Sequence, residues 1–316
     1  MRAPPDDRSP AELLAFGVVN LDKPPGPSAH EMAGWLRDAA ATAVTDADTS
    51  ASSSPVPTID RAAHTGTLDP KVTGSLPVLF GDATRLAQIF ADSLKEYVAV
   101  LELHGPAPAD FGAVVESFEG ELYQKPPRKS AVRRRLRTRT VHTLDVLERD
   151  GRQALLRVRC GAGTYVRKLC HDIGLALGTG AHMGDLRRTA AGTFDETSLV
   201  TAETIVDALA FWASDDDPRR LREIVQPAER ALIELARVVV APSAAEQIAH
   251  GAPVYAPGVI RTEPAPAGGA ESSLSPSSEE LVACCTPDGA AVCLGRLVGD
   301  PTADTGTIVD LERVLI

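Results

Sequence analysis

Residues 64–74, with the sequence His-Thr-Gly-Thr-Leu-Asp-Pro-Lys-Val-Thr-Gly, place the strongest local constraint on how this chain can fold. Pro70 has no N–H and disfavours the α-helical conformation at Asp69, so this carboxylate is expected in a loop. Gly66 and Gly74 allow positive φ or close backbone approach on either side. The stretch is predicted to be a tight loop that presents one carboxylate. Locally the pattern is also typical of an ordinary Asp-Pro turn.

The pattern around this loop is far more specific. The stretch resembles the catalytic motif of the TruB/dyskerin family of pseudouridine synthases, and four further blocks match that family in the same order. They are Asn-Leu-Asp-Lys-Pro-Pro-Gly at 20–26, Lys-Glu-Tyr-Val at 95–98, and the longer blocks at 160–174 and 180–188. The block at 160–174, with Tyr-Gln-Lys-Pro-Pro at 123–127, resembles the archaeal and eukaryotic dyskerin branch.

The resemblance implies an α+β pseudouridine synthase fold with a mixed, largely antiparallel sheet and a central catalytic cleft. Residues 1–232 would form this catalytic domain, with 1–15 as a mobile or peripheral arm. The strand-rich residues 233–316 resemble a PUA domain, a small β-barrel that grips RNA; the alternative is a β-rich appendage that only stabilises the protein. Three segments are expected to be irregular: a low-complexity insertion at 42–57, a basic thumb-like loop at 120–140 and a loop at 261–280.

Periodicity and capping signals predict the elements of these domains. Alternating apolar residues predict a strand at 96–103, strands at 141–147 and 154–160 are expected to form a hairpin, and apolar spacing predicts a helix that begins near 166 and is capped by Gly178. Further helices are predicted at 201–213 and 221–231. Ser28 with Glu31, and Ser243 with Glu246, form the pattern of a capping box, which predicts that a helix begins at each serine.

Pseudouridine formation breaks the N-glycosidic bond of a uridine, rotates the base and rejoins it through carbon. No hydride or phosphate moves, so neither a cofactor nor a metal is expected, and the sequence contains no metal or nucleotide motif. The resemblance implies that Asp69 is the nucleophile, Arg167 its cation and Tyr97 the residue that stacks on the base and assists proton transfer. From the residues alone, each has another interpretation: Arg167 could be an ordinary surface charge of a helix, and Tyr97 could be an aromatic residue of the core.

RNA binding is expected from a second set of residues. The resemblance implies that Leu186 and Tyr165 contact the extruded base and that His64 supports the extruded RNA conformation, whereas Lys23 is either structural or a phosphate contact. The alternatives to these RNA-binding roles are that Leu186 only packs in the core and that His64 is an ordinary hydrogen-bonded histidine. Residues 122–144 contain no acid, and residues 124–140 hold eight basic side chains, which predicts a backbone-binding loop. Those assigned to RNA contact are Lys125, Arg128, Arg133, Arg134 and Arg135, and Lys129 belongs to the same run.

The net charge of −11 is unexpected for a protein that binds phosphates. Only six of the 32 basic residues are lysine, and an acidic, arginine-rich chain is typical of a high-salt cytoplasm, although a GC-rich genome also favours arginine. The five cysteines form no C-x-x-C pair, so they are expected to be small buried side chains in a reducing compartment. No stretch approaches the length of a membrane span, and a cytoplasmic protein is predicted.

The resemblance therefore predicts a pseudouridine synthase of the archaeal type with two possible substrates. One is the uridine of the TΨC arm of tRNA, modified without a guide. The other is rRNA, selected by an H/ACA guide RNA together with small H/ACA ribonucleoprotein partner proteins. The alternative from another class is a non-catalytic RNA-binding scaffold with the same fold. The presence of Asp69, Tyr97 and Arg167 favours the enzyme.

Overall fold

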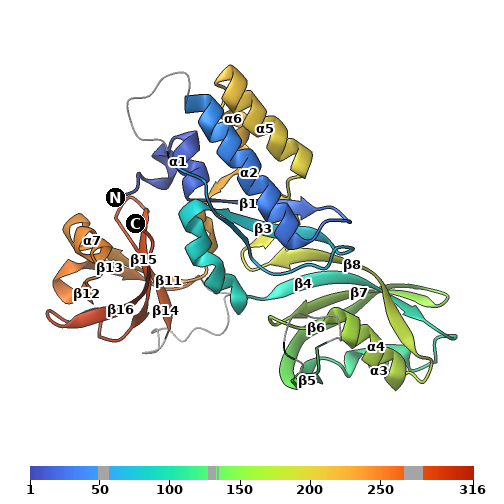
Figure 1. Ribbon diagram of the computed structural model, residues 1–316. Coiled ribbons are helices and arrows are strands. Elements are labelled where there is room, and N and C mark those ends of the chain that lie inside the picture. Colours follow the sequence, from blue (N-terminus) through green and yellow to red (C-terminus); the bar gives the residue numbers. More distant parts are fainter. Residues whose placement is uncertain (49–56, 127–132, 134, 267–279) are drawn as a thin grey trace.

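The computed structural model describes residues 1–48, 57–126, 133, 135–266 and 280–316, and these residues form two β-sheets (Figure 1). The larger sheet has ten strands, of which β2 (Ala62–His64) pairs with β3 and β9 (Phe194–Asp195) pairs with β8. Across it the order is β10 (Gln226–Pro227), β1 (Gly17–Lys23), β3 (Thr73–Phe80), β8 (Ala181–Ala191), β4 (Lys95–Leu103), β7 (Gln153–Cys160), β6 (Arg137–Asp150) and β5 (Gly120–Gln124).

Strand β8 joins the two halves of this sheet. It runs antiparallel to β4 over most of its length, but parallel to β3 through only two register pairs, Thr73 with Arg187 and Gly74 with Arg188. The other named strand pairs of the sheet are antiparallel. The prediction of a mixed, largely antiparallel sheet is confirmed, as is the β6–β7 hairpin.

Each half of the sheet has its own apolar core. Helices α2 (Ala29–Asp48) and α5 (Ala202–Asp215) lie side by side over β1 and β3, whereas α3 (Phe111–Glu116) and α4 (Val166–Ala176) cover the β4–β7 half (Figure 1). The two cores meet at Tyr97 and Leu186, which are partly buried and contact both. The junction of the two halves is therefore lined by residues that the sequence analysis assigns to the site.

Helix ends follow the predicted signals at some positions and not at others. The box at Ser28 is formed, with the Glu31 N–H donating to Ser28 Oγ and the Ser28 N–H to the Glu31 carboxylate. The predicted box at Ser243 is wrong, because α7 (Pro242–Ala249) begins one residue earlier, after Ala241, with proline in its first turn. The predicted helix at 221–231 is also interrupted, since α6 (Arg219–Ile224) ends before β10 and the 3₁₀ turn η4 (Ala228–Leu232).

The smaller sheet has six strands and carries α7. Its order is β12 (Val254–Tyr255), β16 (Thr307–Val314), β15 (Ala291–Leu297), β14 (Leu281–Cys285), β11 (Ala236–Val240) and β13 (Val259–Glu263). The six strands agree with the expectation that residues 233–316 are strand-rich. Apolar side chains of the smaller sheet also pack against η2 (Gly81–Ala91), η4 and β1 of the larger sheet, so the two sheets share a core. All five cysteines are buried and free, as expected.

All three expected irregular segments contain some regular structure, since β13 includes residues 261–263 of the loop expected at 261–280. Residues 42–48, expected in an insertion, continue α2, and strands β5 and β6 occupy both ends of the expected basic loop. The rest of these predictions, at 49–56, 127–132, 134 and 267–279, lies outside the described residues. No helix in the described ranges is long and apolar enough to cross a bilayer.

The prediction of a mobile or peripheral N-terminal arm is wrong. After the 3₁₀ turn η1 (Pro5–Asp7), Arg8 is only 1% exposed and its guanidinium binds the Glu229 carboxylate through two hydrogen bonds of 2.8 and 2.6 Å. Helix α1 (Pro10–Ala15) then buries Leu13 and Leu14. Glu229 also accepts the N–H of Ala291 on β15, so this one carboxylate connects the arm, η4 and the smaller sheet.

We expect Arg8→Met to lower the free energy of unfolding by about 3 kcal/mol, because it leaves the Glu229 carboxylate buried without a cation. Chemical denaturation of the full chain measures the change. The exposed pair Arg37–Asp38 supplies the control, since Arg37→Met should change stability by less than about 1 kcal/mol. Equal effects of the two substitutions would contradict the anchoring role of Arg8.

Candidate active site

Asp69 lies in the loop at residues 65–72, between β2 and β3, as predicted. The Val72 N–H donates to the Asp69 carbonyl at 2.9 Å, and the Gly26 N–H donates to the Pro70 carbonyl at 2.9 Å. Lys23 Nζ donates to the carbonyls of Pro70 and Val72 at 3.0 and 2.9 Å. The backbone on the C-terminal side of Asp69 is therefore fixed by bonds to the preceding β1–α2 segment.

Lys23 itself is a structural residue. It is 0% exposed, and Nζ also donates to the Pro24 carbonyl at 2.9 Å, so three carbonyls use the three ammonium hydrogens. Burial lowers the pKa of Lys23. An enclosed ammonium favours the structural alternative over a direct phosphate contact.

The glycines of the predicted loop are required by the fold. Gly74 has φ +96°, and a Cβ at this position would lie 2.2 Å from the Arg188 carbonyl oxygen on β8. Only glycine permits the parallel pairing of β3 with β8 at this point. Gly66 has φ +150°, and its carbonyl accepts a hydrogen bond from Arg188 Nη2 at 3.2 Å. The loop is thus attached to β8 at both ends.

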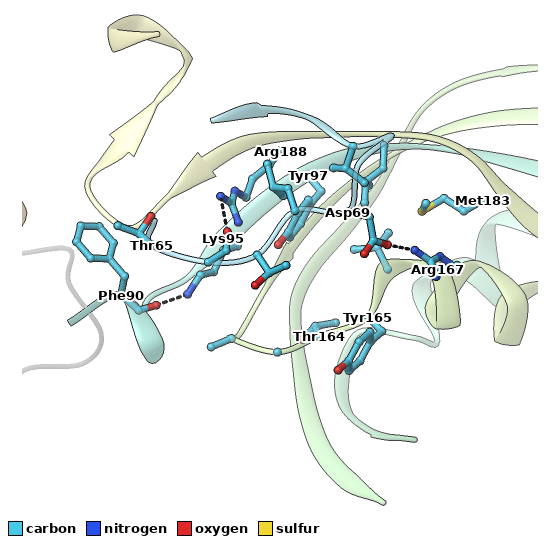
Figure 2. Close-up of a pocket in the computed structure, with 18 of the residues that line it drawn as sticks. Thr65, Asp69, Phe90, Lys95, Tyr97, Thr164, Tyr165, Arg167, Met183 and Arg188 are labelled. Atoms are coloured by element: carbon cyan, nitrogen blue, oxygen red, sulfur yellow. Dashed lines mark hydrogen bonds and ion pairs between the residues drawn. The ribbon is translucent and has the colours of Figure 1, made fainter. Parts of the chain in front are cut away.

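The Asp69 carboxylate forms an ion pair with the Arg167 guanidinium (Figure 2). Arg167 stands in the first turn of α4, which packs against β8 and brings the guanidinium over the loop. The Asp69 and Arg167 side chains are 53% and 48% exposed, so the pair opens to solvent. The Asp69 carboxylate is therefore open to a substrate that enters from solvent, beside a fixed cation.

The pair lies on the wall of a cavity of about 520 Å³, a size that holds a small ligand such as a nucleobase. The cavity brings together the predicted residues Asp69, Tyr97, Tyr165, Arg167 and Leu186 (Figure 2). Burial raises the pKa of the Tyr97 hydroxyl, and the positive charge of Arg188 partly offsets this rise. The cavity therefore combines a charged pair with an aromatic ring and an apolar side chain.

Other predicted residues lie elsewhere. His64 ends β2 and does not line the cavity; burial lowers the pKa of its imidazole, and His30 and Arg188 lower it further. Of the basic run, Lys125, Arg133 and Arg135 are exposed and outside the cavity. Arg128, Lys129 and Arg134 lie outside the described residues.

The cavity also contains two cations that the sequence analysis quotes only within motifs. Lys95 Nζ donates to the carbonyls of Phe90 and Ser93 at 2.5 and 2.7 Å, and burial lowers the pKa of Lys95 to about 8. Arg188 is 1% exposed. A charged residue at an inward position of a strand is the sequence signal that could have identified both. Among the described residues, no group of three His, Cys, Asp or Glu side chains could hold a metal ion.

Comparisons with known protein families agree with this geometry. Residues 56–108 match the TruB family pseudouridylate synthase N-terminal domain, residues 167–233 match the tRNA pseudouridylate synthase B C-terminal domain, and residues 3–33 match the DKCLD (NUC011) domain. The probable tRNA pseudouridine synthase B of Haloarcula marismortui is 61% identical, covering 100% of this chain and 94% of the relative. That of Pyrococcus furiosus is 41% identical, covering 99% and 86%.

Solved structures match the complete fold, including the smaller sheet. A Cbf5–Nop10–Gar1 complex contains a chain that is 40% identical, with a TM-score of 0.84 over 99% of this chain and 89% of that chain. An H/ACA ribonucleoprotein bound to a substrate RNA containing 2′-deoxyuridine gives a TM-score of 0.84 at 38% identity, with 99% and 89% covered. The fold is thus the α+β pseudouridine synthase fold followed by a PUA domain. The chain belongs to the TruB family of pseudouridine synthases, which isomerise uridine to pseudouridine.

Proposed function

We propose that Asp69 is the nucleophile of this pseudouridine synthase, with Arg167 holding its charge and Tyr97 stacking on the extruded base. The observation that carries the proposal is the ion pair between Asp69 and Arg167 on the wall of a base-sized cavity that also contains Tyr97. In the reaction the bond from the sugar C1′ to N1 breaks, the base rotates, and C1′ bonds to C5. Leu186 and Tyr165 contact the base, and His64 supports the extruded RNA from outside the cavity.

The proposed substrates are the uridine of the TΨC arm of tRNA and a uridine of rRNA selected by an H/ACA guide RNA. Relatives named as probable tRNA pseudouridine synthases support the first. Structural neighbours in complexes with Nop10, Gar1 and a substrate RNA support the second, with small partner proteins of that kind bound to this chain. We place the domain boundary at 232/233 and the protein in the cytoplasm. The PUA domain and the basic run from Lys125 to Arg135 would bind the RNA outside the cavity.

Asp69→Asn is expected to lower the rate of pseudouridine formation by more than about 1,000-fold, because the amide keeps the volume but is not a nucleophile. Arg167→Met should lower the rate by about 100-fold. Since the pair is half exposed, we expect either change to alter stability by less than about 1 kcal/mol. Tritium release from uridine in tRNA without a guide, and in rRNA with guide RNA and partner proteins, measures the rates. Near wild-type turnover by Asp69→Asn would overturn the assignment.

Lys23→Met tests whether the rigidity of the loop matters. Three carbonyls would lose their donor, so we expect a loss of about 2 kcal/mol in stability. The rate should fall as well, with RNA affinity unchanged, because Asp69 would no longer be held in place. Lys71→Met, at an exposed lysine of the same loop, is the control for stability. A Lys23→Met variant with weakened RNA binding and an unchanged rate would instead indicate a phosphate contact.

The basic run is tested by its salt dependence. Replacing Arg133 and Arg135 with glutamine should weaken binding to every RNA and reduce the slope of log affinity against log salt by about one for each phosphate that the variant no longer binds. Arg37→Gln with Arg219→Gln changes the net charge equally, at two exposed residues paired to neighbouring carboxylates. If both double variants shift the slope equally, the effect comes from net charge and not from phosphate binding by the run.

A further inference from the structure

Two adjacent arginines on β8 have opposite environments. Arg187 is partly exposed, and its guanidinium binds the Asp22 carboxylate at 2.9 and 3.1 Å and Glu196 at 2.7 Å. Arg188, on the other face of the strand, is 1% exposed. Within the described part of the chain, no carboxylate lies within 4.0 Å of the Arg188 guanidinium. The core of the junction therefore holds a cation without an anion.

Neutral oxygens bind this guanidinium instead. Nε donates to the Ser75 carbonyl at 2.7 Å, and Nη2 donates to the Gly66 carbonyl at 3.2 Å. These bonds satisfy donors but do not neutralise the charge, and burial lowers the pKa of Arg188. A buried charge without a counter-ion is unfavourable for stability. A fixed cation of this kind is favourable where negative charge develops during a reaction.

The oxygen that can carry this negative charge belongs to Tyr97. Tyr97 on β4 is the direct register partner of Arg188 on β8, so the two side chains leave the sheet on the same face. Both line the cavity and lie beside one another in it (Figure 2), and the positive charge of Arg188 lowers the pKa of the Tyr97 hydroxyl against the rise caused by burial. Lys95 is the other nearby cation, but its ammonium is already bound to Phe90 and Ser93.

We propose that Arg188 is a positioning residue that holds the Tyr97 oxygen in the cavity and stabilises that oxygen as a phenolate until it takes a proton from C5 of the rotated base. The inference rests on the proposed function. In this step the C5–H bond breaks and the Tyr97 O–H bond forms. The electron pair left at C5 forms the C5–C6 double bond, the C6–N1 double-bond pair moves to N1, and N1 takes a proton from water. Tyr97 then returns its proton to water.

The same guanidinium also connects the proton acceptor to the nucleophile loop. Gly66, whose carbonyl accepts one bond from Arg188, lies three residues before Asp69, and Ser75, whose carbonyl accepts the other, lies on β3. Arg188 thus fixes the two reacting groups, Asp69 and Tyr97, relative to one another across the junction of the sheet. The Arg187 side chain lies on the opposite face of β8 and is paired to Asp22 and Glu196, so its replacement is a matched control for the loss of a β8 arginine.

The rate should depend on pH through Tyr97. Only the phenolate accepts a proton, so the rate of C5–H cleavage rises with pH until the pH exceeds the pKa of Tyr97. Removing the positive charge raises that pKa, and the rising limb moves to higher pH. The other titratable or charged groups around the tyrosine are Lys95 on its own strand, Cys160 on β7, Asp69 on the loop and Arg167 on α4. All of them are retained in the variants compared.

The test is a double-mutant cycle in the full-length protein, with Arg188→Met, Tyr97→Phe and the double variant. Single-turnover rates are measured on a tRNA transcript and on a guided rRNA with partner proteins, using uridine that carries hydrogen or deuterium at C5. We expect Arg188→Met to lower the rate by about 100-fold, with RNA affinity changed by less than about threefold. It should also raise the C5 isotope effect and move the rising limb to higher pH. In a protein that already carries Tyr97→Phe, adding Arg188→Met should lower the single-turnover rate by less than about threefold.

Arg188→Lys keeps the positive charge, so it should recover part of the rate, and the rise of the rate with pH should occur over the same range as in the wild type. Arg187→Met should leave the isotope effect and the pH limb unchanged. If Arg188→Met does not fold, Arg188→Lys and Arg188→Gln carry the same cycle. Additive losses, with no change in isotope effect or pH limb, would mean that Arg188 only supports the fold and would overturn the inference. A wild-type protein that forms no pseudouridine in either RNA would instead overturn the proposed function.

Discussion

The parallel contact between β3 and β8 is the constraint on which the site depends. Two register pairs join the halves of a ten-stranded sheet, and this join requires a glycine at 74 because the backbones approach so closely. A short join leaves the two cores separate on either side of it. The cavity lies in the space between them, and its residues come from the loop before β3, from β4, from β8 and from the start of α4. No single element could supply such a set of groups.

The charges of the site are divided by exposure. Asp69 and Arg167 form an open pair that an RNA can cover, whereas Lys95 and Arg188 are enclosed by backbone carbonyls. Covering the open pair removes water and strengthens its attraction, since the local dielectric constant falls. The enclosed cations need no such change, because their environment is fixed by the fold. An RNA that covers the cavity would thus change the solvent exposure of the Asp69–Arg167 pair more than that of the enclosed cations.

Local signals in the sequence predicted the Asp69 loop and individual elements, whereas the fold and the roles of the cavity residues were expected from the resemblance of several motifs to a known family. Asp69 is followed by a proline, apolar residues alternate around Tyr97, and Gly178 has the positive φ of a helix cap. Some failures are local, such as the capping box predicted at Ser243, where the helix begins at Pro242. The other failures concern partners distant in the chain. Arg8 pairs with a residue 221 positions away, and nothing near Lys23 indicates that its ammonium is enclosed by a loop almost 50 residues later. The importance of Arg188 likewise depends on which strand lies beside β8.

The triple attachment of Glu229 has a consequence for how the molecule opens. The N-terminal arm, η4 and β15 are bound to one carboxylate, above a core that both sheets share. Neither sheet can then separate without exposing apolar surface of the other and breaking a buried ion pair. Backbone amides of β1 and β15, although they belong to different domains, should therefore exchange their hydrogens with solvent in a single cooperative event. An RNA bound by the PUA domain is consequently held by the same unit of the fold that contains the β1–β3 wall of the cavity.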